Sequence, residues 1–417
     1  MKITIITMET PYPPLHGGRV DVWRRIKALS AQGIKIQLIS WAKTPPSQAD
    51  KEVIQQYVAN FQPLTYEQGS LAFLQRLLHL LHYPLQVSSR IPPQSKLAQI
   101  LAEAKLFSPD FVLLDQLDGC VVAQTLSHQL EVPLVFRSHN IEHQYQRKLL
   151  TESQGFKKIR GYLALHQVEA CELSVLHHSD HFYDISKDDL KYWSQQGFEH
   201  GRYLPCLIDL DEERQRYATV GDEMIYTAAF LGNLCTANNI AGVFWFLEEV
   251  LPILETCLPD LHILIAGSNP TAAVIEKCRQ YPQVTLRANP DSVFEIYRTA
   301  QVLINPVYSG SGTSTKSIDM LATGKPIVTR RKGLFGIPEE VWHLFVIADT
   351  PLAFATAISQ AAQTSQSTSL QPENLQLLEE LFGFSRIKTM VHDLEAALPT
   401  QRKQTQPAAH QQITASS

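Results

Sequence analysis

The sequence is poor in charged residues and has no long apolar run. Asp, Glu, Lys and Arg make up 18% of the 417 residues, below the roughly 25% typical of globular chains, whereas 44% of the residues are hydrophobic. A disordered protein shows the opposite balance, so we expect folded domains with sizeable cores. The longest apolar stretch, Ile240–Leu247, has eight residues, far short of the ~18 that span a bilayer.

Cysteine pairs and a basic bias are also missing. The six cysteines include no CxxC pair, so the sequence favours neither a zinc site nor a disulfide scaffold, and most cysteines should be small core residues. The net charge is −5, unlike that of a dedicated nucleic-acid binder. The apolar segment at the N-terminus is too short for a signal peptide. We therefore expect a cytoplasmic protein, with peripheral contact at the inner face of a membrane left open.

A strand–turn–helix pattern runs along the chain and restarts halfway. A helix between two of the first strands has Gly33 at its expected end. In the first half we expect strands at Lys2–Thr7, Ile34–Ser40, Phe111–Leu114, Val132–Arg137 and His181–Ile185, and a long helix over Ile159–His178. In the second half we expect strands at Ile225–Leu231, His262–Ala266, Val284–Arg287, Val302–Pro306, Pro326–Thr329 and Phe345–Ala348, and a helix over Asn239–Leu254.

This pattern predicts an α/β protein with two doubly wound, Rossmann-like domains that face each other across a cleft. The charged segment Leu204–Arg214 reads as a loop, so we place the domain boundary there. The expected domains are residues 1–207 and 208–373, followed by helices at 374–398 that pack back toward the first domain. The tail at 399–417 is rich in Gln, Thr, Pro and Ser and is expected to be disordered.

Ligands of doubly wound sheets bind beyond the carboxyl ends of the strands, so the loops after strands are candidate sites. The Pro-rich loop after the first strand contains Gly17 and Gly18, which would let the backbone approach an anion at a helix N-terminus. His139 and Asn140 follow another strand and could orient hydroxyl groups. An ordinary turn and an ordinary loop histidine remain the alternative interpretations.

The Gly- and Ser-rich loop Asn305–Ser317 is the richest candidate. Its backbone N–H groups suit a phosphate, Lys316 adds a positive charge in the first helical turn, and Asp319 lies one turn later. A P-loop would need glycine where this chain has Thr315. An ATPase or GTPase is therefore a weak alternative.

Leu71–Leu85 predicts an amphipathic helix with leucines and Phe73 on one face. We expect this helix to be part of the core of the first domain. The alternative is a surface that contacts a membrane or a lipid-linked acceptor.

Together, several motifs resemble glycosyltransferase family 4, the group 1 type with the GT-B fold, over about residues 1–396. In chain order, these motifs are the Pro-rich loop with Gly17-Gly18, Arg137–Glu142, Tyr183–Ser186 with Asp188-Asp189, Phe230–Gly232 with Asn238-Asn239, and Gly310–Pro326. Their order and spacing carry more weight than any one of them.

The resemblance implies a retaining hexosyltransferase that needs neither a metal ion nor a cofactor. The first domain would bind a glycan or lipid-linked acceptor, as in polysaccharide biosynthesis, and the second a UDP- or GDP-sugar. The implied catalytic residues are His139 and Lys316, and the implied acceptor cleft contains Gly17, Gly18 and Asn140. The implied donor site comprises Gly232, Asn233, Gly267, Gly310, Ser311, Gly312, Thr313, Lys316 and Asp319.

Three positions depart from the family pattern. Family members commonly carry two glutamates with seven residues between them, where this chain has Ser311 and Asp319, and an arginine where it has Asn233. Asp319 can still accept hydrogen bonds from ribose, and Lys316 is left as the clearest phosphate ligand. These departures keep open a second reading, a non-catalytic nucleotide-sugar-binding protein of the same fold.

Overall fold

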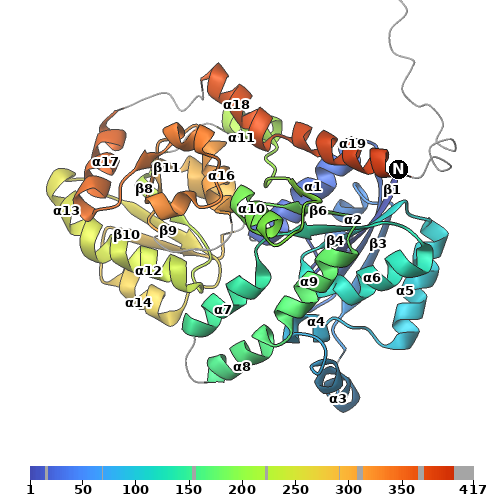
Figure 1. The fold of residues 1–417 in the computed structure, drawn as a ribbon. Helices are drawn as coiled ribbons and strands as arrows, with labels where there is room; N and C mark the ends of the chain where they lie inside the picture. The colour runs from blue at the N-terminus through green and yellow to red at the C-terminus, as the bar shows by residue number, and fades with distance from the viewer. Residues whose placement is uncertain are drawn as a thin grey trace, which may run out of the picture.

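The computed structural model describes residues 1–14, 17–67, 69–152, 156–220, 224–290, 292–307, 313–364 and 371–398. In these ranges the chain forms two α/β domains, each built on one parallel sheet (Figure 1). The predicted fold class, two doubly wound domains facing each other across a cleft, is confirmed. The tail predicted to be disordered lies outside the described residues.

The first sheet has the strand order β3-β2-β1-β4-β5-β6-β7. Its strands are β1 (Lys2–Thr7), β2 (Lys35–Ala42), β3 (Asn60–Thr65), β4 (Phe111–Asp115), β5 (Leu134–Ser138), β6 (His181–Asp184) and β7 (Gly201–Tyr203). The chain runs outward from β1 in both directions, so the order reverses between β1 and β4, where doubly wound sheets bind ligands. β3 was not predicted because its Pro63 interrupts the pattern, which an edge strand tolerates.

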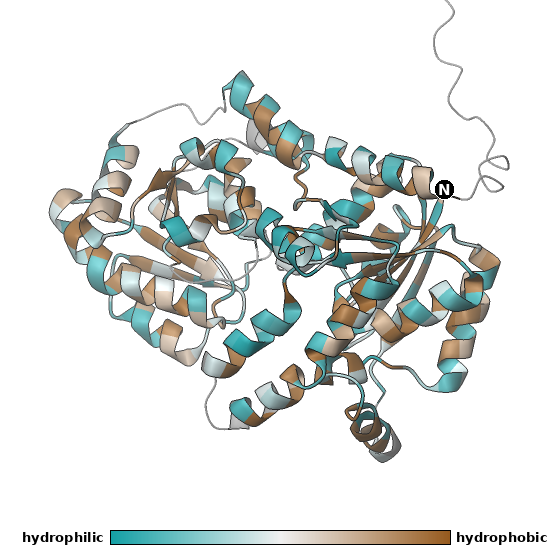
Figure 2. Cartoon of the chain, viewed as in Figure 1, coloured by the Kyte–Doolittle hydropathy of each residue, from teal (hydrophilic) through white to brown (hydrophobic). Residues whose placement is uncertain are grey.

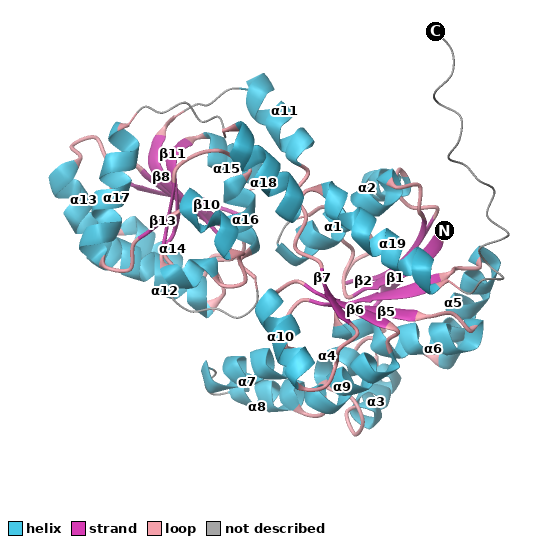
Figure 3. Ribbon diagram, turned by 45° about the horizontal axis from the view of Figure 1, so that its top comes forward, coloured by secondary structure: helices cyan, strands magenta, loops and turns pink. Residues whose placement is uncertain are grey.

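The second sheet repeats the arrangement with the order β10-β9-β8-β11-β12-β13. Its strands are β8 (Tyr226–Leu231), β9 (Ile263–Gly267), β10 (Val284–Ala288), β11 (Ala300–Asn305), β12 (Ile327–Thr329) and β13 (Val346–Ile347). All five residues of β9 are buried. Such continuous apolar runs predict strands well because helices cover a parallel sheet on both faces (Figure 3).

Helices connect the strands in both domains. The first domain contains α1 (Gly17–Ala31), α2 (Gln48–Gln55), α3 (Ser70–His79), α4 (Leu85–Ser88), α5 (Gln94–Phe107), α6 (Cys120–Leu130), α7 (Glu142–Glu152), α8 (Phe156–Leu165), α9 (Val168–His178) and α10 (Lys187–Gln195). The second sheet is accompanied by α11 (Leu210–Val220), α12 (Ala237–Trp245), α13 (Leu251–Cys257), α14 (Ala272–Arg279), α15 (Val293–Arg298), α16 (Thr315–Leu321) and α17 (Pro351–Gln363), and then come α18 (Pro372–Phe382) and α19 (Ile387–Ala397).

Two predicted helices are interrupted. The helix expected over Ile159–His178 is split into α8 and α9, because Gln167 between them adopts a left-handed φ of 58°. The helix expected over Asn239–Leu254 contains a π-helical turn, Phe246–Val250, just before Pro252. Proline cannot donate the next helical hydrogen bond, which accounts for a distortion at this point.

Two further expectations are wrong. Part of the charged segment Leu204–Arg214 is helical, because α11 begins at Leu210 and carries three acidic residues in its first turn, where they favour a helix. The helix expected at Leu71–Leu85 is not a core element. Its apolar side chains are exposed, and the brown colour of α3 marks how hydrophobic the helix is (Figure 2).

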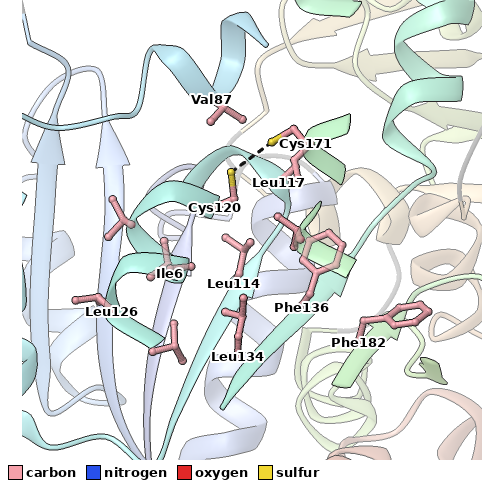
Figure 4. Close-up of a cluster of buried hydrophobic side chains, with 14 of the residues drawn as sticks. Ile6, Val87, Leu114, Leu117, Cys120, Leu126, Leu134, Phe136, Cys171 and Phe182 are labelled. Atoms are coloured by element: carbon pink, nitrogen blue, oxygen red, sulfur yellow. Dashed lines mark hydrogen bonds between the residues drawn. The ribbon is translucent and has the colours of Figure 1, made fainter. Parts of the chain in front are cut away.

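Hydrophobic cores cover both faces of each sheet. Cys120 and Cys171 pack in the core under α6 with their sulfur atoms 3.6 Å apart (Figure 4). Four of the six cysteines are buried, as predicted for most of them, and Cys235 and Cys257 are exposed.

The chain crosses between the domains at two neighbouring points. Ile208, where the chain first leaves the first sheet, donates a backbone hydrogen bond of 2.8 Å to Phe382, at the end of α18. α18 packs against the core of the second sheet. α19 returns to the first domain, where Met390 and Leu394 join a core shared with α1.

Candidate functional site

Lys316 lies in a small cluster at the carboxyl end of β8. Its Nζ atom donates a 2.6 Å hydrogen bond to Oδ1 of Asn239 and lies 4.8 Å from the ring centre of Phe230. The other side-chain atom of that amide, Nδ2, donates to the backbone oxygen of Asn233 at 2.8 Å. The structure therefore brings Lys316 together with the loop Gly232-Asn233, as the predicted donor site requires.

The Lys316 side chain is half-buried. Among the described residues its ammonium group forms no ion pair, and desolvation lowers the pKa of Lys316 to about 7. A partly desolvated cation without a counter-charge is costly, and an anionic ligand would relieve that cost. This geometry suits a phosphate group.

Two glycines assigned to the donor site have structural reasons to be glycine. A Cβ atom on Gly232 would lie 2.8 Å from the Phe230 ring and 2.9 Å from the Asn239 side chain. A Cβ atom on Gly267 would overlap the backbone oxygen of Gly232. Gly267 thus allows the ends of β8 and β9 to approach each other, and no contact with the Lys316 cluster supports a direct role for it.

The first domain meets the predicted donor loop at three points. A Cβ atom on Gly17 would lie 2.5 Å from Oγ1 of Thr315, so the N-terminus of α1 abuts that of α16. Oγ1 of Thr313 donates to the backbone oxygen of Ile185 at 3.2 Å. Gly18 follows in the first turn of α1.

The third contact is an ion pair between Asp319 and Arg24, whose nearest atoms are 2.5 Å apart. The carboxylate expected to hold ribose is therefore already paired with α1. Gly310, Ser311 and Gly312 lie outside the described residues.

His139 lies at the carboxyl end of the first sheet. Its Nε2 atom is 2.8 Å from Oδ1 of Asp115, and its Nδ1 atom is 3.1 Å from Nε2 of Gln116. The simplest assignment has Nε2–H donating to the carboxylate and Nδ1 accepting from the amide. Both ring nitrogens are then in use, which suits a fixed hydrogen-bonding group better than a free base.

Buried charges hold this histidine in place. The Arg25 guanidinium group bridges the carboxylates of Asp115 and Asp21, and its Nη1 atom lies 2.8 Å from Oδ2 of Asp21. Burial alone would raise the pKa of Asp115, but Arg25 and His139 outweigh it and lower the pKa overall. Asp115 therefore stays ionised and fixes the imidazole.

His139 and Asn140 line a cavity of about 880 Å³ in the first domain. Glu142 also lines it, and burial raises the pKa of this carboxyl group to about 7. The cavity extends to Arg76 of α3 and Ala164 of α8. Its size, and the polar side chains among its lining, would admit a sugar-sized group.

Sequence reasoning missed several residues of these clusters. Asn239 was noted only as part of a motif, although it links Lys316 to Asn233. Asp21 and Arg25 lie one turn apart on α1, and Asp115 ends β4. They gave no signal because Asp115 meets the other two only in the fold.

Comparisons with known proteins agree with this architecture. Residues 226–364 match the family model "Glycosyl transferases group 1". Over 368 residues the chain is 26% identical to an uncharacterised 44.6 kDa protein in the cps region of Klebsiella pneumoniae. The aligned region spans 86% of this chain and 90% of that protein.

Solved structures with the same fold cover almost the whole chain. Anabaena HepE in complex with UDP-glucose superposes with a TM-score of 0.61 at 13% identity, over 95% of this chain and 100% of that one. Sucrose-phosphate synthase from Thermosynechococcus elongatus superposes with a TM-score of 0.62 at 16% identity, over 95% of this chain and 100% of that one. The chain thus has the fold of GT-B glycosyltransferases, and its second domain matches the group 1 model.

The described part of the chain lacks both a cluster of metal ligands and a membrane-spanning helix. It contains no group of three or more His, Cys, Asp or Glu side chains that could hold a metal ion. None of its helices combines the length and the hydropathy needed to cross a bilayer.

Proposed function

We propose that the protein is a retaining glycosyltransferase of family 4 that transfers a sugar from a UDP- or GDP-sugar to a glycan or lipid-linked acceptor. Residues 208–373 would bind the donor and residues 1–207 the acceptor, with helices from 374–398 connecting back to the first domain. The observation that carries the proposal is Lys316, which is half-buried beside the Gly232-Asn233 turn and has no acidic partner among the described residues.

The proposed chemistry is electrostatic. The diphosphate leaving group gains negative charge as the bond to the sugar breaks, and a fixed cation in a water-poor site stabilises that charge. Lys316 would supply the cation, and backbone N–H groups of the loop Gly310–Thr313 would add to it. Nδ1 of His139, whose ring is fixed by Asp115, would accept a hydrogen bond from a sugar or acceptor hydroxyl in place of the Gln116 amide, and Asp319 would bind the ribose. No step requires a metal ion.

The similar proteins support the nucleotide sugar and the setting. HepE is seen with UDP-glucose, and the curated relative lies in a cps region. UDP-sugars are therefore the first donors to test, and polysaccharide biosynthesis is the setting we propose.

Donor turnover tests the function directly. The protein should be stabilised against heat by one class of nucleotide sugar, since a ligand at 100 times its Kd adds about 2.7 kcal/mol. It should then release UDP or GDP in the presence of EDTA, and proton NMR of the product should show the anomeric configuration of the donor. Turnover that stops with EDTA and returns with Mg²⁺ would reject the metal-independent mechanism.

One observation favours a second candidate, a protein that binds a nucleotide sugar without transferring it. Asp319 is already paired with Arg24, and Ser311 and Asn233 replace residues that the family commonly uses. Such a protein would bind the donor saturably and never release UDP or GDP. Donor turnover therefore separates the two candidates.

His139→Ala should lower kcat by about 100-fold and change the donor Kd little, because the imidazole is placed for the sugar or acceptor and not for the nucleotide. The readouts are transfer kinetics and donor calorimetry. Gln116→Ala is a milder companion, since it removes one partner of His139 and leaves Asp115 in place. Full turnover in His139→Ala would make this an ordinary loop histidine.

A further inference from the structure

The apolar face of helix α3 points away from the protein, which is the opposite of the orientation in a core helix. Its small or polar side faces the protein: Ala72 is buried, and Arg76 and His79 are half-buried beside a cavity of about 210 Å³. Its apolar side faces outward, with exposed fractions from 45% to 64%. The exposed residues are Phe73, Leu74, Leu77, Leu78 and, just after the helix, Leu81. Their spacing places them on one side of the helix, and such a patch marks an interaction surface.

A second apolar surface lies at the same end of the first domain. α8 exposes Ile159, Tyr162 and Leu163 by 58%, 57% and 41%. α4 contacts both α3 and α8, and both views place the two helices along the same edge of the molecule (Figures 1 and 3). Two helices thus present apolar side chains on one edge.

Both helices come from stretches of sequence without acidic residues. Residues 68–102 contain no Asp or Glu but contain Arg76, Arg90 and Lys96. Residues 153–168 also contain none, and they include two lysines and one arginine. The whole chain has a net charge of −5, so this local bias is opposite to the average.

Arg76 is turned toward the protein and Arg90 pairs with Asp118. The charge at the surface therefore comes from Lys96 and from the exposed Lys158 of α8, with no carboxylate in either stretch. An apolar surface with basic and no acidic neighbours in these stretches complements an anionic lipid surface.

The cavity that contains His139 begins at these helices. Arg76 of α3 and Ala164 of α8 belong to the lining of the 880 Å³ cavity, as does Arg90. Arg90 stacks on Tyr66, with 5.5 Å to the ring centre, and pairs with Asp118 at 2.7 Å. These guanidinium groups and His139 line the same cavity, so a group that occupies it can contact both.

We propose that α3 and α8 dock the protein on an anionic bilayer and that the acceptor is a lipid-linked saccharide whose phosphate-bearing headgroup enters this cavity from the membrane surface. The choice of acceptor rests on the proposed function, whereas the docking surface does not. A second copy of the chain fits the surface less well. In a symmetric dimer the same patch would face itself, and the basic stretches would repel each other.

Sedimentation with vesicles tests the docking surface in the full-length protein. Binding should be strong to phosphatidylcholine vesicles that contain phosphatidylglycerol, weak to phosphatidylcholine alone, and reduced by salt. The double substitution Leu74→Glu and Leu78→Glu should reduce binding at least tenfold, about the effect of withdrawing one leucine side chain from an apolar surface. Both leucines are more than half exposed, so the melting temperature should stay unchanged.

Leu352→Glu is the matched control, because Leu352 is 65% exposed on α17 in the other domain. It should leave vesicle binding unchanged. Equal binding by the wild type and the α3 double variant overturns the proposal. So does a dimer that the same α3 substitutions dissociate, if the wild type does not bind vesicles.

A third measurement separates this proposal from the proposed function. The α3 double variant should keep the wild-type Kd for UDP-glucose, while its transfer to a lipid-linked acceptor in vesicles falls in parallel with vesicle binding. If the wild type binds anionic vesicles but turns over no UDP- or GDP-sugar, the proposed function fails and the docking surface stands. If it turns over the donor without binding vesicles, the docking surface fails alone.

Discussion

Lys316→Met should lower kcat by roughly 100- to 1000-fold, about 3–4 kcal/mol, because it removes one preorganised charge from the proposed leaving-group site. Methionine keeps most of the apolar stem and removes only the ammonium group over Phe230, so the fold should survive. The fold-loss in kcat should exceed the fold-loss in donor affinity, since the negative charge of the diphosphate grows as the sugar departs. Transfer kinetics and a melting curve measure the two effects.

The same lysine should make donor binding depend on pH. Burial lowers the pKa of Lys316 from its ordinary value of 10.5 to about 7, so at pH 8 most free protein carries a neutral amine. A bound diphosphate favours the ammonium form and raises this pKa again. Donor binding at pH 8 should therefore take up close to one proton, and at pH 6 almost none. Calorimetry in buffers of different ionisation enthalpy measures the uptake, which Lys316→Met should abolish.

The contribution of Lys316 to folding stability should change with pH in the direction opposite to that of a salt-bridged lysine. A lysine whose pKa is lower in the folded state binds its proton more tightly when unfolded. The contribution of Lys316 to stability should therefore increase as the pH rises from about 7 to 10.5.

Lys325→Met offers a comparison within the same domain. Lys325 is more deeply buried than Lys316, and its Nζ atom donates to two backbone oxygens, those of Arg298 at 2.9 Å and Ala300 at 2.7 Å. This lysine supports the fold, so its loss should lower the melting temperature with kcat per folded molecule retained. Activity of Lys316→Met within about threefold of wild type would mean that another group carries the phosphate charge.

The strands of both domains could be predicted because their signal is local. Buried parallel strands are continuous apolar runs, and the loops that follow them sit at the ligand-binding edge by topology alone. Gly17, His139 and Lys316 were accessible to this reasoning. Whether Asp319 and Arg24 would meet across the domains was not, because the two residues are 295 positions apart in sequence.

Helix α3 shows a different limit. The periodicity of Leu74, Leu77, Leu78 and Leu81 correctly predicts an apolar face, but a periodic pattern does not say what that face contacts. A core helix was the natural expectation. The structure instead turns Arg76 and His79 toward the protein and leaves the leucines outside, which only the tertiary arrangement could reveal.

Gly17→Ala should reduce kcat/KM by about 100-fold, the scale expected when catalytic groups are displaced by an ångström or so. The new methyl group would lie 2.5 Å from Oγ1 of Thr315, so either α1 or α16 must move. Because Lys316 follows Thr315 directly, a shift of α16 displaces the proposed phosphate ligand. A melting curve should show a folded protein, because Gly17 lies at the start of α1 and its contact with Thr315 is between the domains. The hydrophobic core of each domain is therefore left intact.

A compensating substitution makes this prediction specific. Thr315→Ala removes Oγ1 and leaves the Cβ of residue 315 at 3.5 Å from the added methyl group, an ordinary contact. Thr315→Ala alone should stay within about threefold of wild type, and the double variant should recover most of the lost activity, because residues in direct contact are coupled energetically. If the two effects instead simply add, Gly17 acts through something other than close approach to α16. In that case its backbone, and not the fit between the domains, must be what the ligand contacts.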